Sequence, residues 1–130
     1  MQINLDIPAA RIANMMTSAI ESGDPVTTAA RGGWCVSIET KSRKPINGKW
    51  WWADAGFFEG GFNFEVVELD DEITGHETRH HITSKDVAQG LTIMAQKFPH
   101  IFALILNDDT DGPCADIFLQ CVVFGEEKYA

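Results

Sequence analysis

The chain has 130 residues, of which 45% are hydrophobic and 22% charged, and its formal net charge is −9. This length and composition predict one domain over residues 1–130 that needs no cofactor to fold, and they exclude an intrinsically disordered chain. The negative charge disfavours binding of the whole molecule to a phosphate backbone, because such contacts need Lys or Arg. The start of the chain has no basic segment and the longest apolar run covers only residues 101–106, so we expect a cytoplasmic protein without membrane contacts.

Periodicity predicts a helix and a hairpin in the first half of the chain. Residues 7–22 carry apolar side chains at helical spacing, with Asp6 as N-cap and Gly23 as terminator. Residues 34–40 alternate like a half-buried strand that turns Trp34, Val36 and Ile38 to one face and residues 35, 37 and 39 to the other. A turn signal at residues 47–48 leads into residues 49–54, which we expect to be the second strand of a hairpin with a long basic tip.

The second half predicts two further strands and then helices. Residues 62–69 favour a strand, residues 70–75 a turn, and residues 77–83 a short polar strand. Thr83 and Asp86 form a capping-box pattern at the start of a helix that ends before Pro99. Two more helices are expected over residues 100–106 and from Asp111 to just before Gly125. This order predicts an α+β fold, with an antiparallel sheet of about four strands and helices packed on one face.

The three cysteines argue against a secreted disulfide framework, because their number is odd. Cys114 and Cys121 lie seven residues apart on one predicted helix, so their Cα atoms are roughly 10 Å apart, which exceeds disulfide reach. Cys35 falls within a predicted strand. We therefore interpret all three as packed thiols.

Charge is unevenly distributed along the chain. Residues 41–49 hold four bases and no acid, whereas residues 50–78 hold eight acids and no base. A basic loop therefore adjoins an acidic half of the molecule.

Two segments partly match metal-binding motifs. Residues 76–80 read HETRH, but zinc proteases place this motif on a helix, and in a strand His76 and His80 would lie roughly 13 Å apart. Residues 107–112 resemble the start of a calcium loop, but Phe118 stands where the bidentate acid belongs. We expect no metal or cofactor, and a small metal-dependent hydrolase or a cation-binding module stays as the alternative function.

Three consecutive tryptophans are the least ordinary feature of the sequence. In a strand Trp50 and Trp52 face one way and Trp51 the other, so at least one indole should be partly exposed at the base of the basic tip. They either pack against residues 55–61 or form a binding patch beside the basic loop. If single-stranded nucleic acid stacks on such a patch, the protein is a nucleic-acid binder, which is the second alternative.

Five stretches together carry a resemblance to known proteins: residues 15–23, the strand that begins at Trp34, and residues 57–67, 86–94 and 116–129. Through them the chain resembles a family of small uncharacterised proteins of bacteriophage and prophage genomes. The matching residues are packing residues, so the resemblance implies a viral or prophage origin and no particular activity.

The leading hypothesis is a non-enzymatic phage accessory protein that binds a host or phage protein. Its acid-only stretch could occupy a basic, nucleic-acid-binding surface and so inhibit a host defence. No catalytic residue is predicted. The candidate binding residues are Lys41, Arg43, Lys44, Lys49, Trp50, Trp51, Trp52, Asp70, Asp71 and Glu72.

Overall fold

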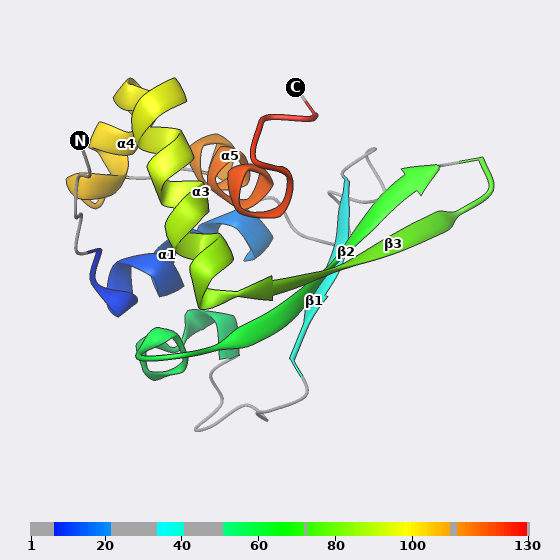
Figure 1. The fold of residues 1–130 in the computed structure, drawn as a ribbon, viewed down its shortest axis with the longest axis horizontal. Coiled ribbons are helices and arrows are strands. Elements are labelled where there is room, and N and C mark those ends of the chain that lie inside the picture. The colour runs from blue at the N-terminus through cyan, green and yellow to red at the C-terminus, as the bar shows by residue number, and fades with distance from the viewer. Residues whose placement is uncertain (1–6, 22–33, 41–50, 72, 110–111, 130) are drawn as a thin grey trace.

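A computed structural model describes residues 7–21, 34–40, 51–71, 73–109 and 112–129. Its antiparallel sheet has the order β1-β2-β3, formed by β1 (Cys35–Glu39), β2 (Asn63–Asp71) and β3 (His76–Thr83). The helices α1 (Ala9–Glu21), α3 (Ser84–Lys97), α4 (Pro99–Leu106) and α5 (Gly112–Phe124) lie on one side of this sheet (Figure 1). The predicted α+β fold is therefore confirmed. No helix within the described ranges is long and apolar enough to cross a membrane.

The helix boundaries follow from local chemistry. The carboxylate of Asp86 accepts hydrogen bonds from the backbone N–H of Thr83 (2.8 Å) and from its hydroxyl (3.0 Å), which starts α3 as predicted. Pro99 is the first residue of α4, where its missing N–H costs nothing. Gly125 adopts a φ of 73° directly after α5, a left-handed conformation that glycine enters without strain.

Helices α3 and α5 approach each other closely at Gly90. A Cβ atom placed on Gly90 would lie 2.7 Å from a side-chain carbon of Val122 and 2.8 Å from its Cα. Both distances are shorter than van der Waals contact, so the close crossing of these helices requires glycine at this position.

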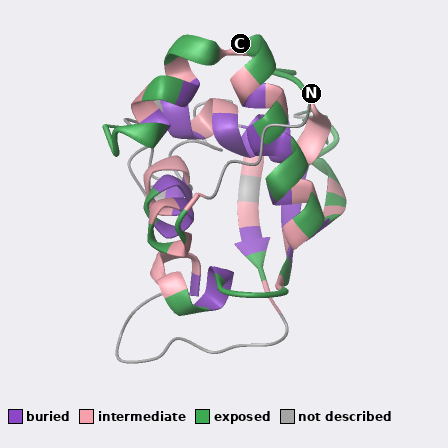
Figure 2. Ribbon diagram, turned by 60° about the vertical axis from the view of Figure 1, so that its left-hand side comes forward, coloured by how far each residue is buried: buried purple, intermediate pink, exposed green. Residues whose placement is uncertain are grey.

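The core lies between the sheet and the helices. Figure 2 shows buried residues on the inner sides of the elements and exposed residues on the outer turns of the helices. Phe64, Val66 and Ile82 project from the sheet into this core. The helices contribute Met15 and Met16 from α1, Met94 from α3, and Phe118 and Leu119 from α5.

The prediction of a strand over residues 49–54 is wrong where the structure describes it. Trp51–Ala53 and Ala55–Phe58 are short 3₁₀ helices, η1 and η2, so the described sheet has three strands instead of about four. The cause is local, because the carboxylate of Asp54 accepts a hydrogen bond from the N–H of Gly56 (2.9 Å) and caps η2. The predicted basic tip falls in residues 41–50, outside the described residues.

A register shift in β1 also corrects the predicted alternation. Cys35 pairs with Glu68 and Ser37 with Val67, so two positions on β1 match one step on β2. Residues paired across strands share a face of the sheet, which places Cys35 on the same face as Ile38. Cys35 therefore points toward the helices, and not away from them with Ser37 and Glu39.

Candidate functional site

Two polar side chains are buried in the described part of the chain, and both lie near its C-terminal end in space. Glu68 is 2% exposed and stands on the helix-facing side of β2, two residues after Val66. Gln120 is 0% exposed and stands on α5. Burial of a carboxylate or an amide costs free energy unless partners satisfy it, so the partners show what the site is built to hold.

Glu68 is satisfied by three donors, two of which come from the C-terminal tail, residues 126–129. His80, on the neighbouring strand β3, lies with its Nε2 2.8 Å from one carboxylate oxygen. The ammonium group of Lys128 donates to the other oxygen at 2.7 Å, and the hydroxyl of Tyr129 donates to the same atom. The tail thus supplies both a charge and a hydroxyl to a buried acid.

These contacts fix the protonation states in the site. Burial acts to raise the pKa of Glu68, but hydrogen bonds from Lys128, Tyr129 and His80 outweigh it and hold the pKa below 4.5. The bond to Glu68 raises the pKa of Lys128, and burial followed by the bond to Glu68 raises the pKa of Tyr129. Glu68 is therefore a carboxylate and Tyr129 a neutral phenol at neutral pH, so the acid accepts and the phenol donates.

Gln120 satisfies the backbone of Tyr129. Its side-chain nitrogen donates to the carbonyl oxygen of Tyr129 at 2.9 Å, and its side-chain oxygen accepts from the N–H of the same residue at 2.7 Å. Both backbone groups of one residue are thus paired, as a neighbouring β-strand would pair them. The nitrogen of Gln120 also donates to Asp116 at 2.7 Å, so its orientation is fixed.

An aromatic wall completes the site. The rings of Trp34 and Tyr129 are stacked, with centroids 6.0 Å apart and an angle of 4° between their planes. Phe124 lies 5.1 Å from Trp34, and the Lys128 ammonium group lies 4.8 Å from the centre of the Phe124 ring. The indole N–H of Trp34 donates to Asp116 at 3.0 Å. We define the tail site as the residues that surround the tail: Trp34, Glu68, His80, Asp116, Gln120 and Phe124.

A second feature is the turn that joins β2 to β3. The carboxylate of Asp71 accepts from the N–H groups of Ile73 (2.9 Å) and Thr74 (3.2 Å), and Gly75 closes the turn with a φ of 72°. The side chain of Ile73 is 96% exposed. Figure 1 shows this turn at one end of the long axis of the molecule, beyond the helices. The turn therefore fixes the backbone at Ile73 and leaves its apolar side chain in solvent.

Acidic and polar side chains flank this turn. The carboxylate of Asp70 lies 2.6 Å from Nδ1 of His76 and accepts a hydrogen bond from the hydroxyl of Thr78. These bonds lower the pKa of Asp70, the one from Thr78 most, and the bond to Asp70 raises the pKa of His76 above 6.5. Glu77 is exposed on the opposite face of β3. We call residues 70–78, apart from the undescribed residue 72, the hairpin turn.

The HETRH segment lies on β3, so it is a strand and not a metal-binding helix. His76 and His80 face the same side but contact different carboxylates, those of Asp70 and Glu68, whereas Glu77 faces away. Within the described residues, no three His, Cys, Asp or Glu side chains are grouped closely enough to hold a metal ion. The calcium-like segment falls partly on residues 110–111, which are not described.

Most of the predicted binding residues are either undescribed or buried. Trp51 is buried and its ring lies 4.7 Å from that of Phe57 and 5.3 Å from that of Phe64, so it belongs to the core. Trp52 is partly buried beside Trp51. Asp70 and Asp71 are exposed at the far end of β2 from Phe64, away from these tryptophans. Lys41, Arg43, Lys44, Lys49, Trp50 and Glu72 lie outside the described residues.

The sequence interpretation missed the tail site. A single signal was present, since Glu68 follows Val66 by two residues and so occupies a core-facing position of a strand. Its partners Lys128 and Tyr129 are 60 and 61 residues away in the chain, and no local pattern connects them.

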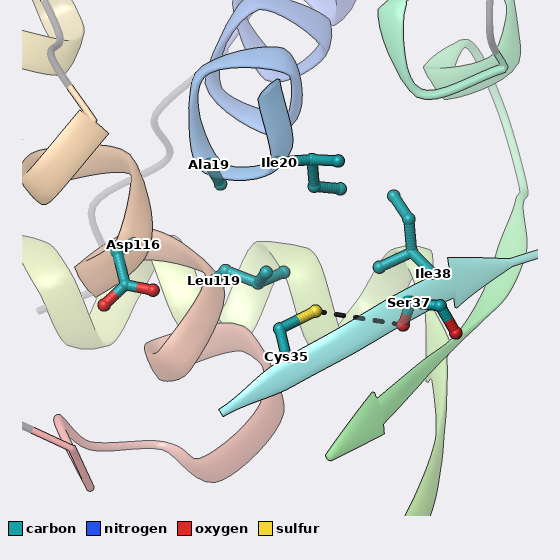
Figure 3. A pocket seen from close by; sticks show the side chains of 7 residues that line it. All are labelled: Ala19, Ile20, Cys35, Ser37, Ile38, Asp116 and Leu119. Atoms are coloured by element: carbon teal, nitrogen blue, oxygen red, sulfur yellow. Dashed lines mark hydrogen bonds between the residues drawn. The ribbon is translucent and has the colours of Figure 1, made fainter. Parts of the chain in front are cut away.

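Cys35 borders a small cavity between α1, α5 and β1 (Figure 3). The cavity measures about 20 Å³, room for about one water molecule. Burial, followed by the negative charge of Asp116, raises the pKa of Cys35 to about 12, so the group is a thiol and a poor nucleophile at neutral pH. Cys114 and Cys121 are buried, as predicted. The lining of the cavity is Ala19, Ile20, Cys35, Ser37, Ile38, Asp116 and Leu119.

Comparisons with protein-family models, with curated proteins and with solved structures found no match to this chain.

Proposed function

We propose that this chain is an accessory protein that acts by binding another protein, and that the hairpin turn is its binding element. A phage or prophage origin, which the resemblance in sequence implies, is part of the proposal. The observation that carries it is Ile73, an almost fully exposed aliphatic side chain held in a turn by the carboxylate of Asp71.

Two properties of the hairpin turn favour binding to another protein, an exposed apolar side chain and a backbone already held by hydrogen bonds. Full burial of an Ile side chain contributes about 2 kcal/mol relative to leaving it in water. The hydrogen bonds from Ile73 and Thr74 to Asp71 already fix the turn, so binding loses little further conformational entropy. The exposed position of Ile73 therefore favours a partner with a small apolar pocket.

The charges around Ile73 indicate the partner's electrostatics. Asp70, Asp71 and Glu77 are exposed around the turn, and negative charge accelerates association with a basic surface. Surfaces that bind nucleic acid are basic, because their Lys and Arg side chains neutralise phosphate groups. Occupation of such a surface on a host protein would inhibit it, and we propose inhibition of a host defence as the role of this binding.

A pull-down from bacterial lysate at low and at high salt tests the proposal. The baits are the wild type, Ile73→Ser, Glu77→Lys and the control Glu59→Lys, which makes the same charge change at an exposed position outside the hairpin turn. We expect a partner with the wild type and the control at low salt, its loss at high salt, and at least tenfold less of it with either hairpin variant. A partner that is retained equally by all four baits, or no partner at low salt, would contradict the proposal.

A further inference from the structure

We propose that the tail site is a binding site for a protein segment with a Lys-Tyr pair, and that the chain's own tail is its resident occupant. The site lies on the body of the fold, on β2, β3, α5 and Trp34 directly before β1, whereas the groups that fill it lie on residues 126–129. This inference concerns a surface separate from the hairpin turn and does not depend on the function proposed for that turn.

Each part of the site recognises a different feature of its occupant. Glu68 accepts from an ammonium group and a phenol, Gln120 pairs with both backbone groups of the residue that carries the phenol, and Trp34 stacks on its ring. A cation followed directly by tyrosine satisfies all three. A segment with Phe in place of Tyr, or with an acid in place of Lys, removes one of the donors to Glu68, and the acid also places a second negative charge beside it.

The site offers an occupant two polar groups that are buried while the tail is in place. Of the described contacts, removal of the tail leaves Glu68 with His80 and leaves Gln120 with Asp116. The bonds that the tail made are then exchanged for bonds to water. The body of the fold therefore presents hydrogen-bonding groups of defined geometry to a segment that replaces this water.

The tail is attached in a way that permits its release. Gly125 ends α5 with a φ of 73°, and residues 127–129 belong to no helix or strand. Glu126, Glu127 and Lys128 are exposed, so the contacts of Lys128 and Tyr129 hold the tail in place. Exposed segments outside helices and strands open at lower free energy than the core does.

Tethering sets the threshold for a competing segment. A tail joined to α5 by a few residues has an effective concentration on the order of mM at its site. A free segment of equal affinity must exceed this concentration to displace the tail. The tail thus excludes weak ligands and admits a partner that also binds elsewhere on the molecule.

The test uses the full chain with Lys128→Ala and Tyr129→Ala, in which the site is vacated. The probe is a fluorescently labelled peptide of sequence Glu-Glu-Lys-Tyr-Ala, which is that of residues 126–130. We expect the peptide to bind the vacated variant at least tenfold more tightly than it binds the wild type, measured by fluorescence anisotropy. Addition of Glu68→Gln to the vacated variant, or Phe in place of Tyr in the peptide, should weaken this binding by about tenfold or more, as expected for a lost hydrogen bond to a charged group.

Two controls keep the outcome decisive. The matched variant Glu39→Gln changes an exposed acid on β1 and should leave peptide binding unchanged. If the vacated variant is less stable than the wild type, the peptide should raise its Tm, because a ligand that binds only the folded state stabilises it. If the peptide neither binds the vacated variant nor raises its Tm, the proposal is overturned. If the vacated variant binds the wild-type chain but not the peptide, the occupant is a second copy, and the assignment to a partner segment is wrong.

Discussion

Glu68 and Asp70 lie two residues apart on the same face of β2 and have matching neighbours. Each contacts a histidine of β3, His80 for Glu68 and His76 for Asp70, and each accepts a hydrogen bond from a hydroxyl group. They differ in their exposure to solvent, because Glu68 is buried beneath the tail and Asp70 is exposed beyond the helices. The histidine and hydroxyl contacts should therefore stabilise the fold at Glu68, which also accepts from Lys128, and contribute little at Asp70.

The largest effect that would test this comparison is the loss of Glu68. We expect Glu68→Ala to lower the free energy of unfolding by about 3 kcal/mol, since it removes bonds to a charged group in a buried site. The matched change Asp70→Ala should leave stability unchanged within experimental error. Urea denaturation followed by circular dichroism measures both free energies of unfolding. Equal losses of stability in the two variants would contradict the claim that burial sets the contribution of each carboxylate.

The second change is made at the crossing of α3 and α5, outside the tail site. Gly90 allows α3 to approach α5, which carries Gln120 and Phe124. We expect Gly90→Ala to cost about 2 kcal/mol, because overpacking against Val122 exceeds the gain in helix propensity. In thermal unfolding, Ala88→Gly on the exposed face of α3 serves as the control and should cost about 1 kcal/mol, as expected from propensity alone. If Gly90→Ala is neutral, the close helix crossing is not required.

A third prediction separates the two carboxylates by pH. The pKa of Glu68 is lower in the folded than in the unfolded state, so its contribution is complete above pH 4.5 and is lost as the pH falls through the folded value. We expect wild type to exceed Glu68→Gln in stability by about 1 kcal/mol near neutral pH, and this gap to close below pH 4.5. Denaturant titrations at several pH values measure it. A gap that is independent of pH would mean that the charge of Glu68 contributes nothing.

The smallest effect concerns the exposed pair and is visible only by spectroscopy. The bond to Asp70 raises the pKa of His76 above 6.5, and Asp70→Asn should return it toward that value. Any linked stability is present below pH 6.5 and lost as the pH rises, and screening by solvent makes it too small to detect by denaturation. NMR titration of the histidine ring protons gives the shift directly. An unchanged titration in Asp70→Asn would show that the pair does not form in solution.

Local patterns were sufficient to predict most of the fold. The helices, the β2–β3 hairpin and the capping box at Thr83 follow from periodicity and capping within a few residues of each element. The strand expected at residues 49–54 failed where it is described because two local choices compete there. Trp favours strands, but Asp54 caps η2 and the ring of Trp51 packs among Phe57 and Phe64.

The two candidate sites differ in how far sequence alone could predict them. Asp70 and Asp71 were predicted as binding residues because an acid-rich run is visible in the sequence. The tail site was not predicted, since it joins β2 to residues near the end of the chain through tertiary packing. A charged residue at a core-facing strand position marks such a site, but only the fold reveals the groups that neutralise it.

The stacking of Tyr129 on Trp34 has an optical consequence. The chain contains one tyrosine, and its ring centroid lies 6.0 Å from that of Trp34. At this separation the energy that the phenol absorbs passes to the indole, so a seated tail emits as tryptophan. Departure of the tail would separate the two rings and raise emission from the tyrosine. The unmodified protein therefore carries its own donor and acceptor pair, with which movement of residues 126–129 would be followed without any attached dye.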